Sequence, residues 1–314
     1  MLKRALIRSE ALTEAIATGQ AVTATDQTSR RDTWLVRANG AAYRLAGDNV
    51  EQIEGCGLTL RAAATRLHPL SPGIAGSLGR TVAASHAQTF MDQELPPVSE
   101  QLPWAFRLGK PGARYLHQAS AASRRLIVEL QRSLAMLAQL ETLQAAWSPA
   151  CTTHNDLTWN NLIVYPVATH ANVTRVEIID WEMAAPGDPC WDIGTLLSEF
   201  VAFWALSIPV FDGEPYEALA KYPIEDLQPA ILAFWESYAK AMAFDRATAR
   251  ERLVKSTRFA GARLIQTSYE RTQTMTHLTP HIYLLLQLSL NIMERPEDAA
   301  EGLFGISLPG RAEA

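Results

Sequence analysis

Three polar side chains suited to metal-assisted chemistry flank two short β-prone runs in the middle of the chain. Asp156 and Asn161 come before the first run, residues 162–165, and Asp180 directly follows the second run, residues 176–179. The polar connection between the runs is typical of a hairpin. Because antiparallel pairing brings the residues before the first strand beside those after the second, we expect the three side chains to meet.

Two carboxylates and an amide at one point are oxygen ligands that suit Mg²⁺, which usually binds through one or two carboxylates plus substrate phosphates. Phosphoryl transfer needs such ligands, and it also needs a carboxylate that orients the attacking hydroxyl and accepts its proton. The pattern H-x-D-x-x-x-x-N, which runs from His154 to Asn161, supplies a residue for each task together with Asp180. The sequence therefore predicts phosphoryl-transfer chemistry at this point.

Two simpler interpretations of these residues stand beside this one. Asp and Asn before a strand are common turn formers, so each residue taken alone fits turn chemistry. Asp188 and Cys190 could form a zinc site with Cys151 and His154, although the C-x-x-C or His-rich spacing of such sites is missing. The agreement of spacing, strand context and a second Asp favours phosphoryl transfer over both alternatives.

The elements that must position these residues change in kind along the chain. Up to about residue 57 strand and turn signals dominate. Asn39 and Gly40 lie between two β-prone runs and predict a tight hairpin, because both residues tolerate positive φ. Helical signals dominate from Ser71, which forms a cap and first turn with Pro72. The chain therefore combines a β-rich amino-terminal part with a helical carboxyl-terminal part.

Helical spacing and capping residues predict five helices. They begin at Ser71, near Ser120 or Ser123, and at a cap formed by Asp226, and the last two cover about 247–271 and 280–293. The expected inward stripes are Leu78, Val82, His86 and Phe90 in the first, Ile127, Leu130, Leu134 and Leu137 in the second, and Leu227, Ile231, Phe234, Tyr238 and Met242 in the third. The second stripe is too short for a coiled coil, so we expect a bundle.

Composition excludes several classes of protein. The 314 residues are 48% hydrophobic and carry a formal net charge of −5, so the chain is neither disordered nor a sequence-independent nucleic-acid binder. The longest apolar segments, 200–211 and 282–293, are shorter than the ~20 residues that span a bilayer. The amino terminus lacks a secretory stretch, and Cys56, Cys151 and Cys190 form no disulfide framework. We expect a soluble cytoplasmic protein without a nucleic-acid or membrane partner.

The run HNDLTWNNLIV and the later run VEIIDWEMAAPGDPCWDIG closely resemble the catalytic segment of the aminoglycoside phosphotransferase and choline kinase group. Members of this group have a protein-kinase-like fold. The resemblance implies an α+β two-lobe fold, with a small β-rich N-lobe at residues 1–57 and a large, mainly helical C-lobe at residues 58–314. The catalytic hairpin, residues 153–182, would belong to the C-lobe.

The resemblance also implies a role for each residue of the motif. Asp156 would be the catalytic base, Asn161 a metal ligand and Asp180 the principal Mg²⁺ ligand. His154 would brace the catalytic loop. Asp192, in the D-I-G element that follows, would hold backbone amides.

Three residues outside this motif have expected roles. His86 lies in SLGRTVAASHAQ, which is similar to the helix after the interlobe hinge of this group, and is expected to be a packing residue. Glu199 and Asp212 lie on the expected acceptor side of the site. They would either favour a cationic acceptor or be solvated surface carboxylates.

The amino-terminal part departs from the pattern of the group, whose members use a strand Lys held by a helix Glu to contact phosphates. No Lys occurs between Lys3 and Lys110, and no G-x-G-x-x-G is present. Arg44 is the nearest substitute, because it keeps the charge and can contact phosphate. Its interpretation as an ordinary surface residue stands beside this one. Glu51 or Glu54 could pair with it, or that segment could already be the hinge between the lobes.

The expected function is an ATP- and Mg²⁺-dependent phosphotransferase acting on a hydroxyl. The acceptor would be a small molecule, or Ser or Thr of a precursor peptide, because some phosphotransferase-like proteins of peptide natural-product biosynthesis look similar. A small N-lobe implies weaker binding of ATP, or a partner protein that completes the cover. The alternative is a pseudokinase, a binding or scaffolding module without catalysis.

Overall fold

The structure of the protein is a computed structural model. The backbone is described for 23–26, 33–38, 41–46 and 49–53, and side chains as well as backbone are described for most of 58–66, 69–90, 102–107, 119–166, 174–211 and 214–308.

The first four strands form an antiparallel sheet of their own. They are β1 (Thr23–Asp26), β2 (Thr33–Ala38), β3 (Ala41–Ala46) and β4 (Asn49–Ile53), in the spatial order β1-β2-β3-β4. Ala38 of β2 pairs with Ala41 of β3, as the predicted hairpin requires. Asn39 and Gly40 lie outside the described residues. The prediction of a β-rich amino-terminal part is therefore confirmed for these strands.

The hairpin that is predicted to be catalytic belongs to a second sheet. Strand β7 (Leu162–Pro166) pairs antiparallel with β8 (Thr174–Ile178), and β5 (Leu58–Thr59) pairs with the other edge of β7. The register places Leu162 opposite Ile178, so the residues before β7 lie beside those after β8. The short strands β6 (Cys151–Thr153) and β9 (Ala185–Gly187) pair on either side of the hairpin in sequence. The predicted hairpin is confirmed.

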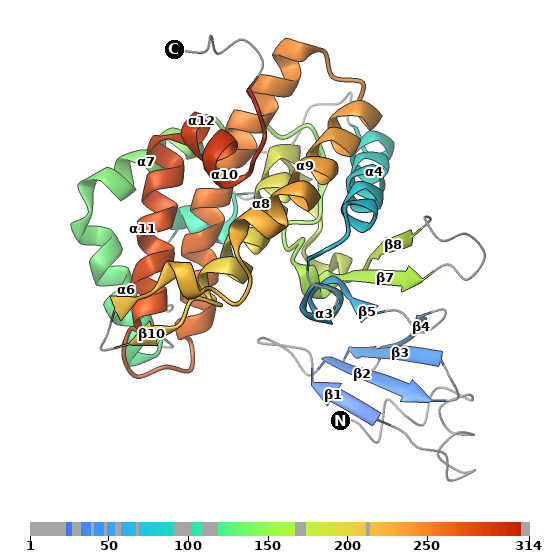
Figure 1. Cartoon of the computed structure of the whole chain (residues 1–314), viewed down its shortest axis with the longest axis horizontal. Helices are drawn as coiled ribbons and strands as arrows, with labels where there is room; N and C mark the ends of the chain where they lie inside the picture. The colour runs from blue at the N-terminus through green and yellow to red at the C-terminus, as the bar shows by residue number, and fades with distance from the viewer. Residues whose placement is uncertain are drawn as a thin grey trace.

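Helices make up most of the remaining described chain (Figure 1). They are α3 (Leu60–Arg66), α4 (Pro72–Gln88), α6 (Ala121–Arg132), α7 (Leu134–Ala145), α8 (Pro189–Ala205), α9 (Ile224–Ala241), α10 (Arg246–Thr272), α11 (Pro280–Glu294) and α12 (Pro296–Asp298). Short helical turns are η2 (Trp104–Arg107), η3 (Trp159–Asn161), η4 (Trp181–Met183), η5 (Glu217–Leu219) and η6 (Ala299–Leu303), and β10 (Val210–Phe211) pairs with β11 (Glu214–Pro215). The fold is α+β, as predicted. No helix in the described residues has both the length and the apolar character needed to cross a membrane.

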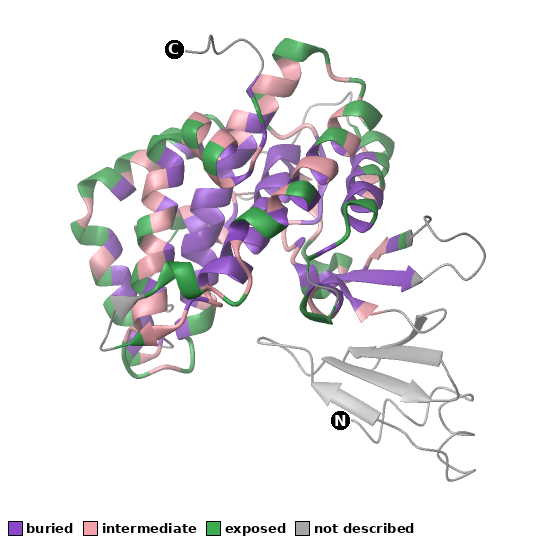
Figure 2. Cartoon of the chain, in the orientation of Figure 1, coloured by how far each residue is buried: buried purple, intermediate pink, exposed green. Residues whose placement is uncertain are grey.

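Helix α8 is the centre of the helical part, and every one of its residues is buried (Figure 2). A helix that is apolar on nearly all sides must be covered on all sides, and α10 covers one of them. The two helices approach closely at Gly194, where a Cβ atom would lie 2.8 Å from the carbonyl oxygen of Ser256 and 2.9 Å from the backbone nitrogen of Ala260. Glycine therefore sets the distance between α8 and α10.

Two of the predicted helices differ from the observed ones. The segment after Ser120 is two helices, because Ser133 ends α6 and caps α7 by accepting from the Met136 N–H. The predicted single stripe is therefore wrong beyond Leu130, and Leu134 is 80% exposed. The third helix begins at Ile224, after Pro223, so Asp226 lies in its first turn instead of capping it.

The first predicted helix is confirmed as α4, with Ser71 accepting from the Gly73 N–H and Pro72 in the first turn. Its stripe is buried as far as His86, but Phe90 lies beyond the last helical residue and is 56% exposed. Periodicity failed there because the helix ends two residues before Phe90.

Candidate active site

The segment from His154 to Asn161, called the catalytic loop for its predicted role, is anchored to the first turn of α8 by Asp192. This carboxylate is buried, and its two oxygens accept from consecutive backbone N–H groups, that of His154 at 2.7 Å and that of Asn155 at 3.0 Å. The Nε2–H of His86 donates to the same carboxylate at 3.2 Å, and Nδ1 of His86 lies 3.0 Å from the hydroxyl of Tyr238. Asp192 thus holds backbone amides, and His86 is more than a packing residue because it links α4 to this anchor.

His154 connects the loop to the end of β8. Its Nδ1 accepts from the Asp156 N–H at 3.3 Å, so the other ring nitrogen, Nε2, carries the proton and donates to the carbonyl of Ile179 at 2.9 Å. The ring is buried. These two bonds are the ones that a bracing residue needs, since they join the residue before the hairpin to the residue after it.

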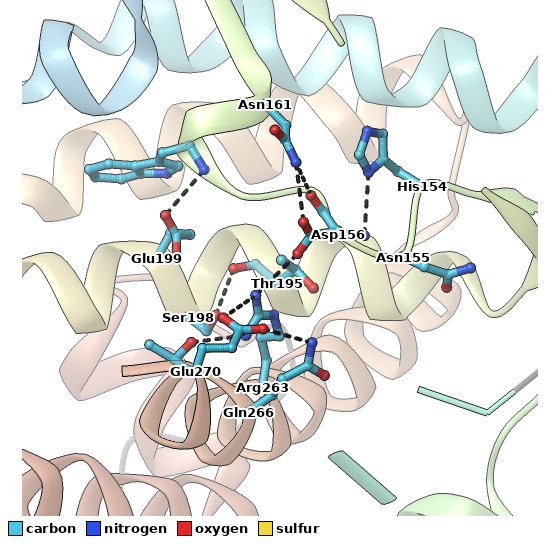
Figure 3. Close-up of polar contacts among 12 residues, drawn as sticks. His154, Asn155, Asp156, Asn161, Thr195, Ser198, Glu199, Arg263, Gln266 and Glu270 are labelled. Carbon is cyan, nitrogen blue, oxygen red and sulfur yellow. Dashed lines mark hydrogen bonds and ion pairs between the residues drawn. The ribbon is translucent and has the colours of Figure 1, made fainter. Parts of the chain in front are cut away.

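Asn161 is hydrogen-bonded to Asp156 (Figure 3). The amide nitrogen of Asn161 donates to the backbone carbonyl of Asp156 at 2.8 Å and to its carboxylate Oδ2 at 3.3 Å. Because the nitrogen of the amide faces Asp156, the amide oxygen Oδ1 faces away from it. That oxygen is the atom with which Asn161 could bind a cation.

Asp180 lies beside Asn161 at the end of β8. The Ile179 N–H donates to the Asn161 carbonyl at 2.9 Å, so the two candidate metal ligands lie on neighbouring, bonded backbone segments. Asp180 has the left-handed φ of +71°, and Asn155 has a φ of +64°. Such conformations cost side-chain-bearing residues about 1–2 kcal/mol, although Asn and Asp tolerate them best. The backbone therefore turns sharply on both sides of the candidate site.

The residues fit a magnesium ion by the chemistry of their donors. The carboxylate of Asp180 and the amide oxygen of Asn161 are hard oxygen ligands. Within the described ranges, no group of three or more His, Cys, Asp or Glu side chains could hold a metal by itself. This set suits Mg²⁺, which binds through few protein ligands and keeps water and phosphate oxygens, and does not suit a site made of protein ligands alone.

The zinc interpretation finds no support in the described part of the chain, where no such group occurs. Cys151 and Cys190 are both buried and free. Burial, with added repulsion from nearby Asp188, raises the pKa of each thiol to about 12. Without a bound metal both thiols are therefore protonated at neutral pH.

The structure adds a residue that the sequence analysis missed, Arg263 of α10. Its side chain is 1% exposed, and Nη2 lies 3.4 Å from Oδ1 of Asp156 and 3.3 Å from Oε2 of Glu270 (Figure 3). Burial alone would lower the pKa of Arg263, but the carboxylates of Glu270, Asp156 and Glu199 outweigh burial and raise it. A permanently charged guanidinium therefore lies against the candidate base.

A weak signal for Arg263 exists in the sequence. Arg263 and Glu270 are seven residues apart in a helical run, so they lie two turns apart on one face. The spacing could indicate that they pair, but it could not indicate that the pair faces Asp156.

Glu199 does not have the role expected for it. It is buried on α8 and accepts from Nη2 of Arg61 at 2.9 Å and from the backbone N–H of Trp159 at 3.1 Å. Glu199 was expected either to attract a cationic acceptor or to be a solvated surface carboxylate. Both expectations are wrong, because the carboxylate is buried and already binds Arg61 of α3 and the backbone of the loop. Asp212 lies outside the described residues.

The candidate phosphate-binding residue of the first sheet is described only by its backbone. Arg44 lies on β3, opposite Glu51 of β4 in the register. Glu54 and the side chain of Arg44 lie outside the described residues. The pairing of Arg44 with Glu51 and its contact with phosphate stay predictions.

Comparisons with known proteins agree with this geometry. The sequence profile of the phosphotransferase enzyme family matches residues 9–241, and the chain belongs to this family. A search of curated proteins gave no match. The predicted relationship to the aminoglycoside phosphotransferase and choline kinase group and the predicted enzyme class, a phosphotransferase with an alcohol acceptor, are confirmed at the level of the family.

Two solved structures show the same fold. An ethanolamine kinase of Plasmodium vivax is 13% identical, with 85% of this chain and 82% of that chain covered and a TM-score of 0.51. A choline/ethanolamine kinase family protein of Mesorhizobium loti is 14% identical, with 94% of each chain covered and a TM-score of 0.51. The protein-kinase-like two-lobe fold expected from the sequence is therefore confirmed.

Proposed function

We propose that the protein transfers the γ-phosphoryl group of ATP to a hydroxyl group, with Mg²⁺ as cofactor. The observation that carries this proposal is the bonded unit of Asp156 and Asn161, joined through the Asn161 carbonyl to the segment that ends in Asp180. Phosphoryl transfer needs a base and metal ligands at one place, and this unit contains both.

In the proposed reaction, Asp156 orients the acceptor hydroxyl and takes its proton. The acceptor oxygen forms a bond to the γ-phosphorus as the bond between that phosphorus and the β–γ bridging oxygen breaks, and the electron pair leaves with ADP. The Asp156 side chain is 34% exposed while anchored at both oxygens, so an acceptor can reach it. Asn161 and Asp180 would hold the metal, which when bound neutralises the charge of the phosphate oxygens.

The acceptor is proposed only by class. The solved relatives act on ethanolamine or belong to a choline/ethanolamine kinase family, which supports a small hydroxyl-bearing molecule. Ser or Thr of a natural-product precursor peptide is the other acceptor that we propose, because the small N-lobe resembles that of some phosphotransferase-like proteins of peptide natural-product biosynthesis. The small first sheet supports a partner protein that completes the cover of the nucleotide. The proposed location is the cytoplasm.

The first prediction tests the catalytic unit. The purified chain is incubated with γ-labelled ATP, MgCl₂ and choline, ethanolamine, an aminoglycoside, a Ser/Thr peptide or water alone, with and without any co-encoded partner. We expect Asp156→Ala and Asp180→Ala each to lower kcat by at least about 10²-fold, the lower range for the loss of a positioned base. Both variants should still fold and unfold cooperatively, and wild-type turnover in either variant would contradict the assignment.

The same experiment tests the alternative of a binding or scaffolding module without catalysis, which the lack of a Lys between Lys3 and Lys110 favours. In that case the wild type turns over no acceptor, whether or not ATP with Mg²⁺ raises its melting temperature. A catalyst shows both turnover and a shift, because a ligand stabilises the state that binds it.

A further inference from the structure

Helix α10 lies beyond the residues that match the family profile, yet it places a charge against the catalytic loop. Arg263 is one of the largest fully buried side chains among the described residues. A buried guanidinium is costly unless carboxylates and other acceptors compensate it. Its partners are Asp156, Glu270 and Thr267, at distances of 3.0–3.4 Å.

The carboxylate of Asp156 is held from two sides. Oδ1 faces Nη2 of Arg263, and Oδ2 faces the amide nitrogen of Asn161. One donor on each oxygen restricts rotation of the carboxylate plane, which an exposed aspartate would otherwise perform freely. The orientation of Asp156 therefore depends on a residue 107 positions away in the sequence.

The guanidinium itself is held by its own helix. Both of its Nη atoms lie 3.3 Å from Oε2 of Glu270, and Nη1 donates to the hydroxyl of Thr267 at 3.0 Å. The other oxygen of Glu270 accepts from Gln266 at 3.0 Å. These residues lie on one face of α10 by their spacing, so a rigid helix carries the whole support.

We propose that Arg263, held by Glu270, is a positioning residue for Asp156, keeping its carboxylate in the orientation that receives the acceptor hydroxyl. Arg263 acts through Asp156 and does not contact the acceptor. This inference rests on the proposed function, since it assigns the support of the proposed base. The competing explanation is that Arg263 and Glu270 only stabilise the packing of α10 against the rest of the fold.

The test separates positioning from stability by removing both charges. Arg263→Met alone removes the guanidinium that faces the carboxylates of Glu270 and Asp156, and it is expected to lower the melting temperature. The double variant Arg263→Met/Glu270→Gln removes one positive and one negative charge, so its melting temperature should recover. If Arg263 only maintains the fold, turnover recovers with it; if Arg263 positions Asp156, turnover stays low.

We expect kcat of the folded double variant to be about 10²-fold below wild type, the size of effect that misplacing a catalytic group has. The KM for MgATP should stay within about twofold, because the nucleotide is held by other residues. Arg263→Lys keeps the charge but loses the planar guanidinium with its several donors. Its kcat should therefore lie between the kcat of the wild type and that of the double variant. The rate is measured with the best acceptor of the panel, or as ATP hydrolysis with water.

Arg258→Met is the matched control on the same helix. Arg258 donates to the side-chain oxygen of Gln139 at 3.1 Å and contacts none of the site residues named above. Its kcat should equal that of the wild type. Loss of turnover in this control would assign the effect to α10 in general and overturn the proposal.

Wild-type kcat in the folded double variant overturns the inference and leaves the proposed function intact. If the double variant does not fold, wild-type kcat in Arg263→Lys does the same. A rise in KM for MgATP with unchanged kcat also overturns it, since positioning acts on the chemical step. A wild-type chain without turnover, alone or with its partner, refutes the proposed function and the inference with it.

Discussion

Buried acceptors hold the catalytic loop at the scale of single residues. Asp192 accepts from two consecutive backbone amides and from His86, and each bond involves a group that is buried or partly buried. Hydrogen bonds to a charged acceptor are among the stronger ones in proteins. One carboxylate therefore fixes the direction in which the chain enters the site.

The second prediction concerns this carboxylate. Asp192→Asn replaces one acceptor oxygen by an NH₂ group, which would face a backbone N–H as donor against donor. We expect the free energy of unfolding to fall by about 1–3 kcal/mol, the cost of leaving a buried polar group unpaired. We also expect kcat to fall, because the loop that carries Asp156 loses its anchor. Urea unfolding and the turnover assay measure the two effects.

The matched control is Asp245→Asn at the start of α10. Asp245 caps this helix by accepting from the Thr248 N–H at 2.7 Å, and Asn is an equally good cap. Unfolding and turnover should match the wild type. An Asp192→Asn variant as stable and active as this control would show that the anchor is not needed.

At the scale of elements, α8 supports the loop at both ends. Asp192 and Glu199 are seven residues apart on α8, so they lie on one face two turns apart. Asp192 holds the amides of His154 and Asn155, and Glu199 holds the amide of Trp159. The loop is thus fixed to one buried helix, whereas Arg263 reaches it from α10.

The third prediction concerns the distance between α8 and α10. Gly194→Ala would place a Cβ 2.8 Å from a carbonyl oxygen and from Cβ of Phe259, and backbone cannot yield as a flexible side chain can. We expect a loss of about 1–3 kcal/mol in unfolding free energy, as for other overpacked sites. We also expect lower kcat, because α10 must shift relative to Asp156.

Gly302→Ala serves as its control. Apart from its chain neighbours and the local helix backbone, no heavy atom of the described residues lies within 4 Å of the Cβ that this substitution would add. Its melting temperature should be unchanged or slightly higher, and its turnover unchanged. If Gly194→Ala behaves in the same way, α8 and α10 can move apart enough to accept the added methyl group without loss of stability.

At the scale of the whole molecule, two buried thiols make stability depend on pH. Burial raises the pKa of Cys151 and of Cys190 to about 12 in the folded chain, from an ordinary value of 9.0. The folded state therefore binds more protons than the unfolded state between these values. The stabilisation is fully present below pH 9 and is lost as pH rises toward 12.

We expect the free energy of unfolding to fall above pH 9 with a slope of up to about 1.4 kcal/mol per pH unit for each thiol. The variant Cys151→Ala/Cys190→Ala should be less stable at pH 7, because a buried sulfur atom is removed at each site. Its free energy of unfolding should depend less steeply on pH between pH 9 and pH 11. Denaturant unfolding at several pH values measures both. Parallel slopes in the two proteins would mean that the thiols do not ionise on unfolding.

Local sequence was sufficient for the parts of the site that local structure builds. The spacing from His154 to Asn161 and the two β-prone runs predicted the hairpin, because strand pairing depends on short-range pattern and turn chemistry. Helix boundaries were less predictable. Ser133 interrupts a continuous apolar pattern with a cap, and Pro223 starts a helix before the residue that the pattern favoured.

The sequence alone determined the family, the α+β fold, and the hairpin that presents the candidate catalytic motif. The tertiary structure decided which charges support that motif. Arg263 and Glu199 reach the loop from helices 107 and 40 residues away, and Arg61 meets Glu199 across 138 residues. No local pattern encodes such pairs, because a buried charge finds its partner only when the packing of whole helices has removed both from water.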